Sequence, residues 1–307
     1  MVNGMDEFYE ELDKLYEVGN QGAIESFIIG TIGKFEYVDE QRSLTCASIY
    51  NELAGFYRGV SRYAESADAF LTSLSIFEEN GYRASSEYAT ILLNLAGLRR
   101  LTGDIVNAIE LFLTAKDIFE SAGAKDTYAY ISTLNNIALA YKESGDYDQA
   151  LTYAAGALDQ IRQSGDDHDI ATSLNNLAAI YLETGDLSSA GDLISEAFVL
   201  YDRMPEKNVH YAAALSTKAS LLYRAGDYIG ALANFRRALD WTNRFFGENI
   251  EFAICKRNIS DVLEQLGDIH AAVIELSYAA AVMDRILGAE HPSVIETRRK
   301  LEQWGTV

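Results

Sequence analysis

The stretch Ser132-Thr-Leu-Asn-Asn-Ile-Ala-Leu-Ala-Tyr141 decides the architecture, together with Lys142-Glu-Ser-Gly-Asp-Tyr-Asp-Gln-Ala150 directly after it. Its apolar residues recur at helical spacing, at Leu134, Ile137, Ala138 and Tyr141. Gly145 can adopt the left-handed conformation that ends a helix, and Asp146 can cap the next one. Small residues then follow at Ala150, Ala154 and Ala157. The stretch therefore predicts two closely packed helices joined by a tight turn.

The same unit recurs along the whole chain when it is aligned on the turn residue. The equivalent positions lie 40 to 42 residues apart and are Gly19, Ser61, Gly103, Gly145, Gly185, Gly226 and Gly267. Aspartate follows the turn in five units, at Asp104, Asp146, Asp186, Asp227 and Asp268. Asn20 is an equally good cap in the first unit, whereas Arg62 departs from the pattern. The chain is a repeat protein with a period of about 41 residues.

Three columns of mostly small residues keep a fixed distance from the turn, as close helix packing requires. The column seven before it reads Leu12, Ala54, Ala96, Ala138, Ala178, Ala219 and Ser260. The column five after it reads Ile24, Ser66, Ala108, Ala150, Ala190, Ala231 and Ala272. The column twelve after it reads Thr31, Ser73, Ala115, Ala157, Ala197, Ala238 and Ala279. Bulkier residues predicted for the core lie four before the turn, at Leu15, Tyr57, Tyr141, Tyr181, Leu222 and Leu263, and Arg99 interrupts that column.

These columns resemble the tetratricopeptide repeat family, through the Leu-Asn-Asn-Ile/Leu-Ala-x-x-Tyr segment, the Gly-Asp turn and the later alanines. The period is longer than that family's minimal 34 residues. In its length the repeat unit is similar to the repeats of kinesin light chains. Two segments resemble the connection in those repeats, Phe245-Phe-Gly-Glu-Asn249 and Leu287-Gly-Ala-Glu-His-Pro-Ser-Val294. The resemblance implies an all-α fold, a right-handed α-solenoid of about seven helix-turn-helix units. We expect one array over residues 1–307, with repeats near 5–40, 43–84, 85–124, 127–166, 168–206, 209–248 and 250–290 and a capping helix at 294–304.

The resemblance also implies that the first helix of each unit lines a concave groove. Amides gather on that face in the middle units, and an amide can donate to and accept from a peptide backbone. Arg58, Arg100 and Lys142 form a basic ladder that favours an acidic or carboxylate-bearing ligand. Residues six before the turn are mostly small, which leaves room for a ligand. The predicted groove residues are Asn51, Arg58, Asn94, Arg100, Asn135, Asn136, Lys142, Asn175, Asn176, Thr217 and Asn258.

A purely structural interpretation of these residues stays open. The asparagines nine before the turn can hydrogen-bond between neighbouring helices of the stack. The basic residues can pair with Glu52, Glu143 or Glu183 on a solvated surface, where such pairs contribute little. Arg298-Arg-Lys300 near the end of the capping helix suits a helix C-terminus better than it suits a docking patch.

Composition narrows the function further. The net charge of −21 disfavours binding to nucleic acid or to anionic membranes. An acidic N-terminus, without the features of a signal peptide, and the absence of a long apolar run favour a cytoplasmic protein. Cys46 and Cys255 fit free thiols inside helices, and the four histidines lack metal-ligand spacing. We expect no cofactor, no metal and no catalysis. His168, in the run Asp166-Asp-His-Asp169, and His291, before Pro292, fit loop and capping roles.

The leading hypothesis is a protein-protein interaction scaffold that binds a peptide segment of a partner in its groove. A second hypothesis is a regulatory protein that senses a peptide or small ligand and acts through a separate effector. A third is a structural repeat protein that self-associates. The oligomeric state is left open.

Overall fold

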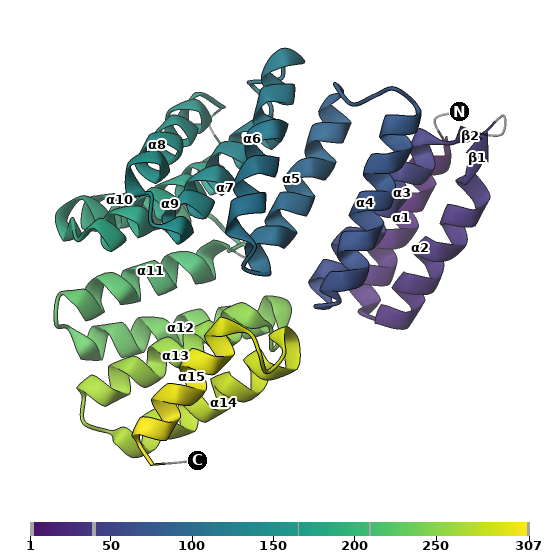
Figure 1. Cartoon of the computed structure of the whole chain (residues 1–307). Coiled ribbons are helices and arrows are strands. Elements are labelled where there is room, and N and C mark those ends of the chain that lie inside the picture. Colours follow the sequence, from purple (N-terminus) through teal and green to yellow (C-terminus); the bar gives the residue numbers. More distant parts are fainter. Residues whose placement is uncertain (1–2, 39–40, 165, 209, 306–307) are drawn as a thin grey trace. The chain divides into compact units, whose positions relative to one another are not determined.

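A computed structural model of the chain describes residues 3–38, 41–164, 166–208 and 210–305. These residues form fifteen α-helices, arranged as seven helix-turn-helix pairs and one final helix (Figure 1). The pairs are α1 (Asn3–Val18) with α2 (Gln21–Phe35), α3 (Leu44–Gly59) with α4 (Tyr63–Glu79), α5 (Ser86–Leu101) with α6 (Ile105–Ser121), α7 (Tyr128–Ser144) with α8 (Tyr147–Ser164), α9 (Asp167–Thr184) with α10 (Leu187–Arg203), α11 (His210–Arg224) with α12 (Tyr228–Phe246), and α13 (Ile250–Gln265) with α14 (Ile269–Leu287). The last helix is α15 (Pro292–Gln303). The fold is an α-helical repeat solenoid, as predicted.

The turn inside each pair has the predicted backbone conformation. The six turn glycines have φ between 72° and 85°, and Ser61 has φ of 62°. In the six turns after the first, the next N–H reaches the carbonyl five residues earlier, as from Asp146 N to Tyr141 O at 3.0 Å, which is the Schellman pattern. The aspartate then caps the second helix, as where Asp186 accepts from the N–H of Ser189 at 3.0 Å.

The second and third turns differ from this scheme. The Asp104 carboxylate accepts hydrogen bonds from the Asn107 side chain, at 2.8 and 2.9 Å, and no backbone N–H of α6 donates to it. Arg62 contacts Glu25 at 2.8 Å and Glu65 at 2.9 Å, and its guanidinium lies 4.3 Å from the centre of the Tyr57 ring. Electrostatic contacts therefore replace a cap in the second unit.

The three small-residue columns form the core between the helices, and every member is at most 4% exposed. Where serine replaces alanine, its hydroxyl donates to a carbonyl of the other helix of the same pair. Ser66 Oγ reaches Ala54 O at 2.8 Å, and Ser260 Oγ reaches Ala272 O at 2.8 Å. These hydrogen bonds satisfy hydroxyls that would otherwise be buried without a partner.

The column four before the turn is less buried than predicted. Tyr57 and Leu263 lie in the core, but Leu15, Tyr141, Tyr181 and Leu222 are only half-buried. The column lies one helical turn from the loop, so fewer neighbours cover these side chains; the Tyr141 ring stacks on Tyr153 at 5.8 Å. Arg99 is partly exposed, and its Nη1 lies 4.0 Å from Asp104 Oδ2.

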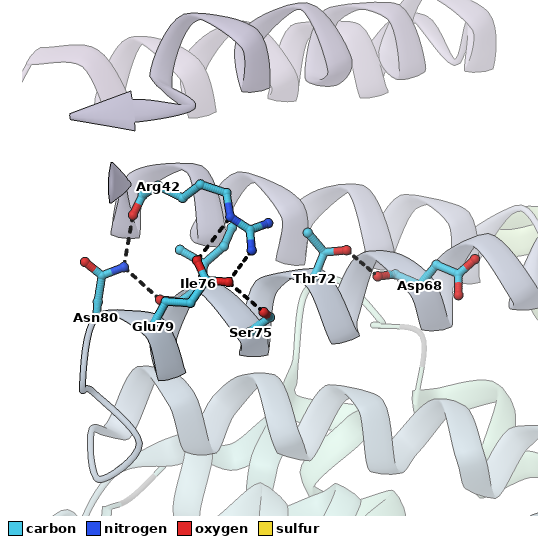
Figure 2. Close-up of polar contacts among 7 residues, drawn as sticks. All are labelled: Arg42, Asp68, Thr72, Ser75, Ile76, Glu79 and Asn80. Carbon is cyan, nitrogen blue, oxygen red and sulfur yellow. Dashed lines mark hydrogen bonds and ion pairs between the residues drawn. The ribbon is translucent and has the colours of Figure 1, made fainter. Parts of the chain in front are cut away.

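A short hairpin that the sequence pattern did not indicate connects the first two pairs. Strands β1 (Tyr37–Val38) and β2 (Gln41–Arg42) pair antiparallel, with Tyr37 opposite Arg42. Figure 2 shows how Arg42 then contacts α4: its guanidinium binds the Glu79 carboxylate, with Nε to Oε2 at 3.2 Å, and Asn80 Nδ2 donates to its carbonyl at 2.9 Å. The hairpin thereby joins the connection between α2 and α3 to the end of α4.

The chain divides into two compact units, Met1–Ala140 and Tyr141–Val307. Inside each unit, the first helices of consecutive pairs touch, as α3 touches α5 and α9 touches α11. A single array over residues 1–307 stays a prediction.

The final helix α15 packs against α14 in the second unit (Figure 1). His291 caps its start by accepting from the N–H of Ser293 at 3.2 Å. Lys300 lies in the last turn of α15, where the sequence analysis places a basic residue, and both Arg298 and Lys300 also pair with neighbouring helices. Arg298 Nη2 lies 3.0 Å from Asp284 Oδ2, and Lys300 Nζ lies 2.6 Å from both Asp261 and Glu264.

Candidate functional site

The predicted groove residues all lie on the first helices of the pairs, whose surface is here called the first-helix face, and Asn175 and Thr217 among them are buried. Asn51, Arg58, Asn94, Arg100, Asn135 and Asn136 lie in the first unit, and Lys142, Asn175, Asn176, Thr217 and Asn258 lie in the second. The columns come from helical spacing: residues three and four apart share one side of a helix. Each unit presents its own part of this face.

On the first unit, part of the predicted amide row is used inside the protein. Asn94 Nδ2 donates to Asn51 Oδ1 at 3.0 Å, which links α5 to α3. Asn136 Nδ2 donates to Ser132 O of its own helix at 2.9 Å. The Asn94 amide therefore has the structural role considered for these asparagines, a hydrogen bond between neighbouring helices of the stack. Asn135 is half-buried on α7.

Arg58 lies across the neighbouring helix. Its Nη1 is 3.5 Å from the carbonyl oxygen of Asn94, and a Cβ on Gly97 would lie 3.4 Å from the same nitrogen. The small residue at position 97 therefore makes room for this guanidinium as well as for any ligand. The pKa of Arg58 lies below its ordinary value, first because burial disfavours the charged form and then because Arg100 carries the same charge. Among the described residues, no carboxylate forms an ion pair with Arg58.

Glu52 lies nearly two turns before Arg58 on the same helix and faces two tyrosines of α1. Its Oε1 accepts hydrogen bonds of 3.5 Å from the Tyr9 hydroxyl and from Asn51 Nδ2. Burial raises the pKa of the Glu52 carboxyl more than these long hydrogen bonds lower it. Burial, and next the Glu52 charge, raise the pKa of Tyr9 to about 12 and also raise the pKa of Tyr16. No cation in the described part of the chain pairs with Glu52, so the alternative in which a basic residue of the ladder pairs with this carboxylate does not hold.

On the second unit, the first-helix face is hollowed into a pocket of about 330 Å³. Its lining comes from the ends of α7 and α9, the middle and end of α11, one residue of α12 and part of α13. Predicted groove residues in this lining are Lys142, Thr217 and Asn258, and the others are Ala179, Leu182, Glu183, Ser216, Ser220, Tyr223, Arg224, Phe235 and Asp261. Small side chains six before the turn, Ala179 and Ser220, are among them, as the spacing required for an open face.

Charges of both signs surround the pocket and largely pair with each other. Arg224 Nη2 lies 2.8 Å from Glu183 Oε2, and its other terminal nitrogen donates to the Leu182 carbonyl. Asp261 is held by Lys300 from α15. Glu183 therefore pairs with Arg224, a residue two before the turn that belongs to none of the predicted columns. Nine of the twelve lining residues were not predicted for the groove, although Ala179 and Ser220 occupy the column six before the turn.

The remaining predicted asparagines of this unit lie outside the pocket lining. Asn175 is only 6% exposed, and its Oδ1 accepts no hydrogen bond from the described residues. Asn176 is half-buried beside it on α9. Thr217, which does line the pocket, is also buried, and its hydroxyl donates to Ala213 O at 3.1 Å. Because this hydroxyl is already used within the helix, the Thr217 side chain helps to shape the pocket and does not offer it a free donor.

The two thiols have the role expected of them, whereas His168 lies in the first turn of helix α9 and not in a loop. Cys46 and Cys255 are both buried free cysteines in helices, and burial raises the pKa of the Cys255 thiol to about 12. Asp166 caps α9 by accepting from the N–H of His168 at 2.8 Å. Within the described ranges, no three histidine, cysteine or carboxylate side chains gather as metal ligands would.

Comparisons with known proteins agree with the repeat fold. The sequence matches the tetratricopeptide repeat family over residues 45–121, 87–159 and 129–201, which together make up just over half of the chain. The chain therefore belongs to the tetratricopeptide repeat family, as its turn and alanine columns predicted. No curated protein matches the sequence.

Solved structures with the same fold include three informative examples. BtubC (BKLC) from P. vanneervenii has a TM-score of 0.59 and 23% identity, over 66% of this chain and 84% of that chain. NprR in complex with its cognate peptide NprX has a TM-score of 0.65 and 17% identity, over 97% and 80%. A Rap protein complexed with competence and sporulation factor has a TM-score of 0.57 and 14% identity, over 97% of each chain. At these identities the likeness shows the fold alone. None of the described helices of this chain is long and apolar enough to cross a membrane.

Proposed function

We propose that this protein is an interaction scaffold, rather than an enzyme, that binds a short peptide segment of a partner protein along its first-helix face. The observation that carries the proposal is the pocket of about 330 Å³ on the second unit, because it opens on the columns that helical spacing assigns to this face. A pocket of that volume accommodates one or two side chains, which can anchor a longer segment.

The basic residues of the face favour an acidic or carboxylate-bearing segment. Lys142 lines the pocket of the second unit, and Arg58 and Arg100 lie on the first unit. Guanidinium and ammonium groups bind carboxylates through charge-assisted hydrogen bonds. The net charge of −21 makes nucleic acid and anionic membranes poor partners, and we place the protein in the cytoplasm.

A pair of tryptophan substitutions tests the proposal. Ser220→Trp fills the pocket without changing the charge, and Ser195→Trp places the same side chain on the exposed side of α10, where Ser195 bonds only to its own helix at 2.7 Å. Both variants and the wild type are used for affinity capture from the host lysate, after their melting temperatures have been compared. A partner kept by the wild type and Ser195→Trp but lost by Ser220→Trp supports the pocket as the binding site. Equal retention by all three overturns it.

The pocket's volume also favours a second candidate, a regulator that senses a small peptide. Two solved structures of this fold are complexes, NprR with its cognate peptide NprX and a Rap protein with competence and sporulation factor. Native mass spectrometry of protein purified from its host tests this candidate, because a retained peptide adds a defined mass. Loss of that mass in Ser220→Trp, with retention in Ser195→Trp, assigns it to the pocket. Sedimentation of the wild type at several concentrations separately tests self-association.

A further inference from the structure

Two opposite charges on helix α3 have no counter-charge among the residues that the structure describes. Glu52 receives hydrogen bonds of 3.5 Å from Tyr9 and Asn51, and Arg58 contacts the Asn94 carbonyl, also at 3.5 Å. Neither forms an ion pair within the described residues. Both side chains are half-buried, so each has lost part of its hydration.

The two groups cannot neutralise one another. They are six residues apart on one helix, which places them about 9 Å apart along its axis and about a third of a turn apart around it. The pKa of each is shifted toward its neutral form, upward for Glu52 and downward for Arg58, with burial as the largest cause. A charged pair fully exposed to water would not show such shifts.

The surroundings of the two groups differ in a way that suits different ligand side chains. Tyr9 and Tyr16, which are 40% and 47% exposed, stand beside Glu52, and an aromatic ring next to a carboxylate favours a cation. The Nη1 atom of Arg58 lies over Gly97, which has no side chain to cover it, and Arg100 adds a second positive charge. That end of α3 favours a carboxylate.

We propose that the first-helix face of the first unit binds a bipolar peptide segment, with a basic side chain at Glu52 and an acidic side chain at Arg58. An extended chain advances about 3.3 Å per residue, so the two side chains are about three positions apart in the sequence of the ligand. This inference rests on the proposed function, because it assumes that a peptide lies along this face. It goes further by fixing a charge pattern where the basic ladder alone indicates only an acidic ligand.

Selection from a phage-displayed library of random dodecapeptides tests the charge pattern. The baits are the wild type, Glu52→Gln, Arg58→Gln and the exchange variant Glu52→Arg/Arg58→Glu, which keeps the net charge of −21. The wild type should enrich peptides with a basic and an acidic residue about three positions apart. Glu52→Gln should lose the basic preference alone, and Arg58→Gln the acidic preference alone. A wild-type peptide should bind either Gln variant about tenfold more weakly in fluorescence anisotropy.

The exchange variant supplies the strictest outcome. It should enrich the opposite order of the two charges, because the peptide direction set by the rest of the face is unchanged. Thermal melts of all baits confirm that they are folded. Identical preferences in the wild type and the Gln variants overturn the bipolar site, as does a wild-type pool without the paired charges. Ser220→Trp is used as a fifth bait. If a pool without the paired charges is lost with this variant, the proposed function stands and this inference alone fails; a pool sensitive to neither site removes both.

Discussion

Asn94 donates a 3.0 Å hydrogen bond from Nδ2 to Oδ1 of Asn51, 43 residues earlier in the chain. The two residues occupy first helices of consecutive repeats, so this bond joins α3 to α5 side by side. An amide that was predicted to hold a ligand backbone instead helps to hold the stack.

The hydrogen bond between these asparagines should therefore contribute measurably to the free energy of unfolding. Asn94→Ala should lower the free energy of unfolding by about 1 kcal/mol, because it removes a partly buried hydrogen bond and leaves the Asn51 carbonyl oxygen without its donor. Chemical denaturation at neutral pH measures the change. Asn136→Ala is the matched control, because the Asn136 amide bonds only within its own helix and should cost less. An equal loss in both variants would contradict a role for the bond between repeats.

Ser61 is the one described non-glycine residue with positive φ, at 62°, in a turn where six other repeats have glycine. Ser61→Gly should raise the free energy of unfolding by about 0.5 to 1 kcal/mol, since relief of the left-handed strain exceeds the added entropy of the unfolded chain. Gly145→Ser is the reciprocal control, because φ at Gly145 is 84° and a Cβ added there would meet no atom within 4 Å. The decrease in the free energy of unfolding in this variant therefore reports backbone conformation alone. Calorimetry of both variants gives the sign of each effect.

A tyrosine–glutamate contact recurs between repeats and was not predicted from the sequence. Tyr88 donates to Glu78 at 2.8 Å, and Tyr130 donates to Glu120 at 2.7 Å, in each case ten residues apart. Tyr88→Phe should destabilise the protein by about 0.5 kcal/mol at pH 7, a value reduced for the partial exposure of Glu78. The exposed Tyr82→Phe should have no effect.

The same contact predicts a pH dependence. The hydrogen bond from Tyr88 is the largest cause that lowers the pKa of Glu78 below its ordinary 4.5. A lowered pKa in the folded state contributes stability that is present above 4.5 and disappears as the pH falls through the folded value. The difference between Tyr88→Phe and the wild type should therefore shrink on acidification below pH 4.5, in denaturation curves recorded across that range. A difference that stays constant with pH would show that the hydroxyl contributes through packing alone.

Glu52 should behave in the opposite way. Burial raises its pKa above 4.5, so its ionisation destabilises the folded state, and stability from this group is lost as the pH rises through the folded value. Glu52→Gln should be up to roughly 1 kcal/mol more stable than the wild type at pH 7 and should lose that advantage near pH 4. Urea midpoints at the two pH values give the comparison. A Gln variant less stable than the wild type at pH 7 would show that the carboxylate is compensated within the protein.

The sequence by itself determined the repeat architecture, because that architecture rests on local requirements repeated at a fixed period. A left-handed turn needs glycine, a helix start needs a capping oxygen, and close helix contact needs a small side chain, as at Gly145, Asp146 and Ala150. Each requirement involves residues near one another in the chain. The same spacing placed Lys142, Thr217 and Asn258 on the face where the pocket opens.

Only the tertiary structure decided which polar groups on that face are used within the protein. Asn94 donates a hydrogen bond to Asn51, Arg224 forms an ion pair with Glu183, and Lys300 of the last helix forms an ion pair with Asp261. These partners are about 40 residues apart, and their pairing depends on side-chain conformations across helix contacts that no local spacing specifies. The same packing leaves Glu52 and Arg58 half-buried without a counter-charge from the described residues. Glu52 is contacted by a phenol and an amide, and Arg58 by a backbone carbonyl.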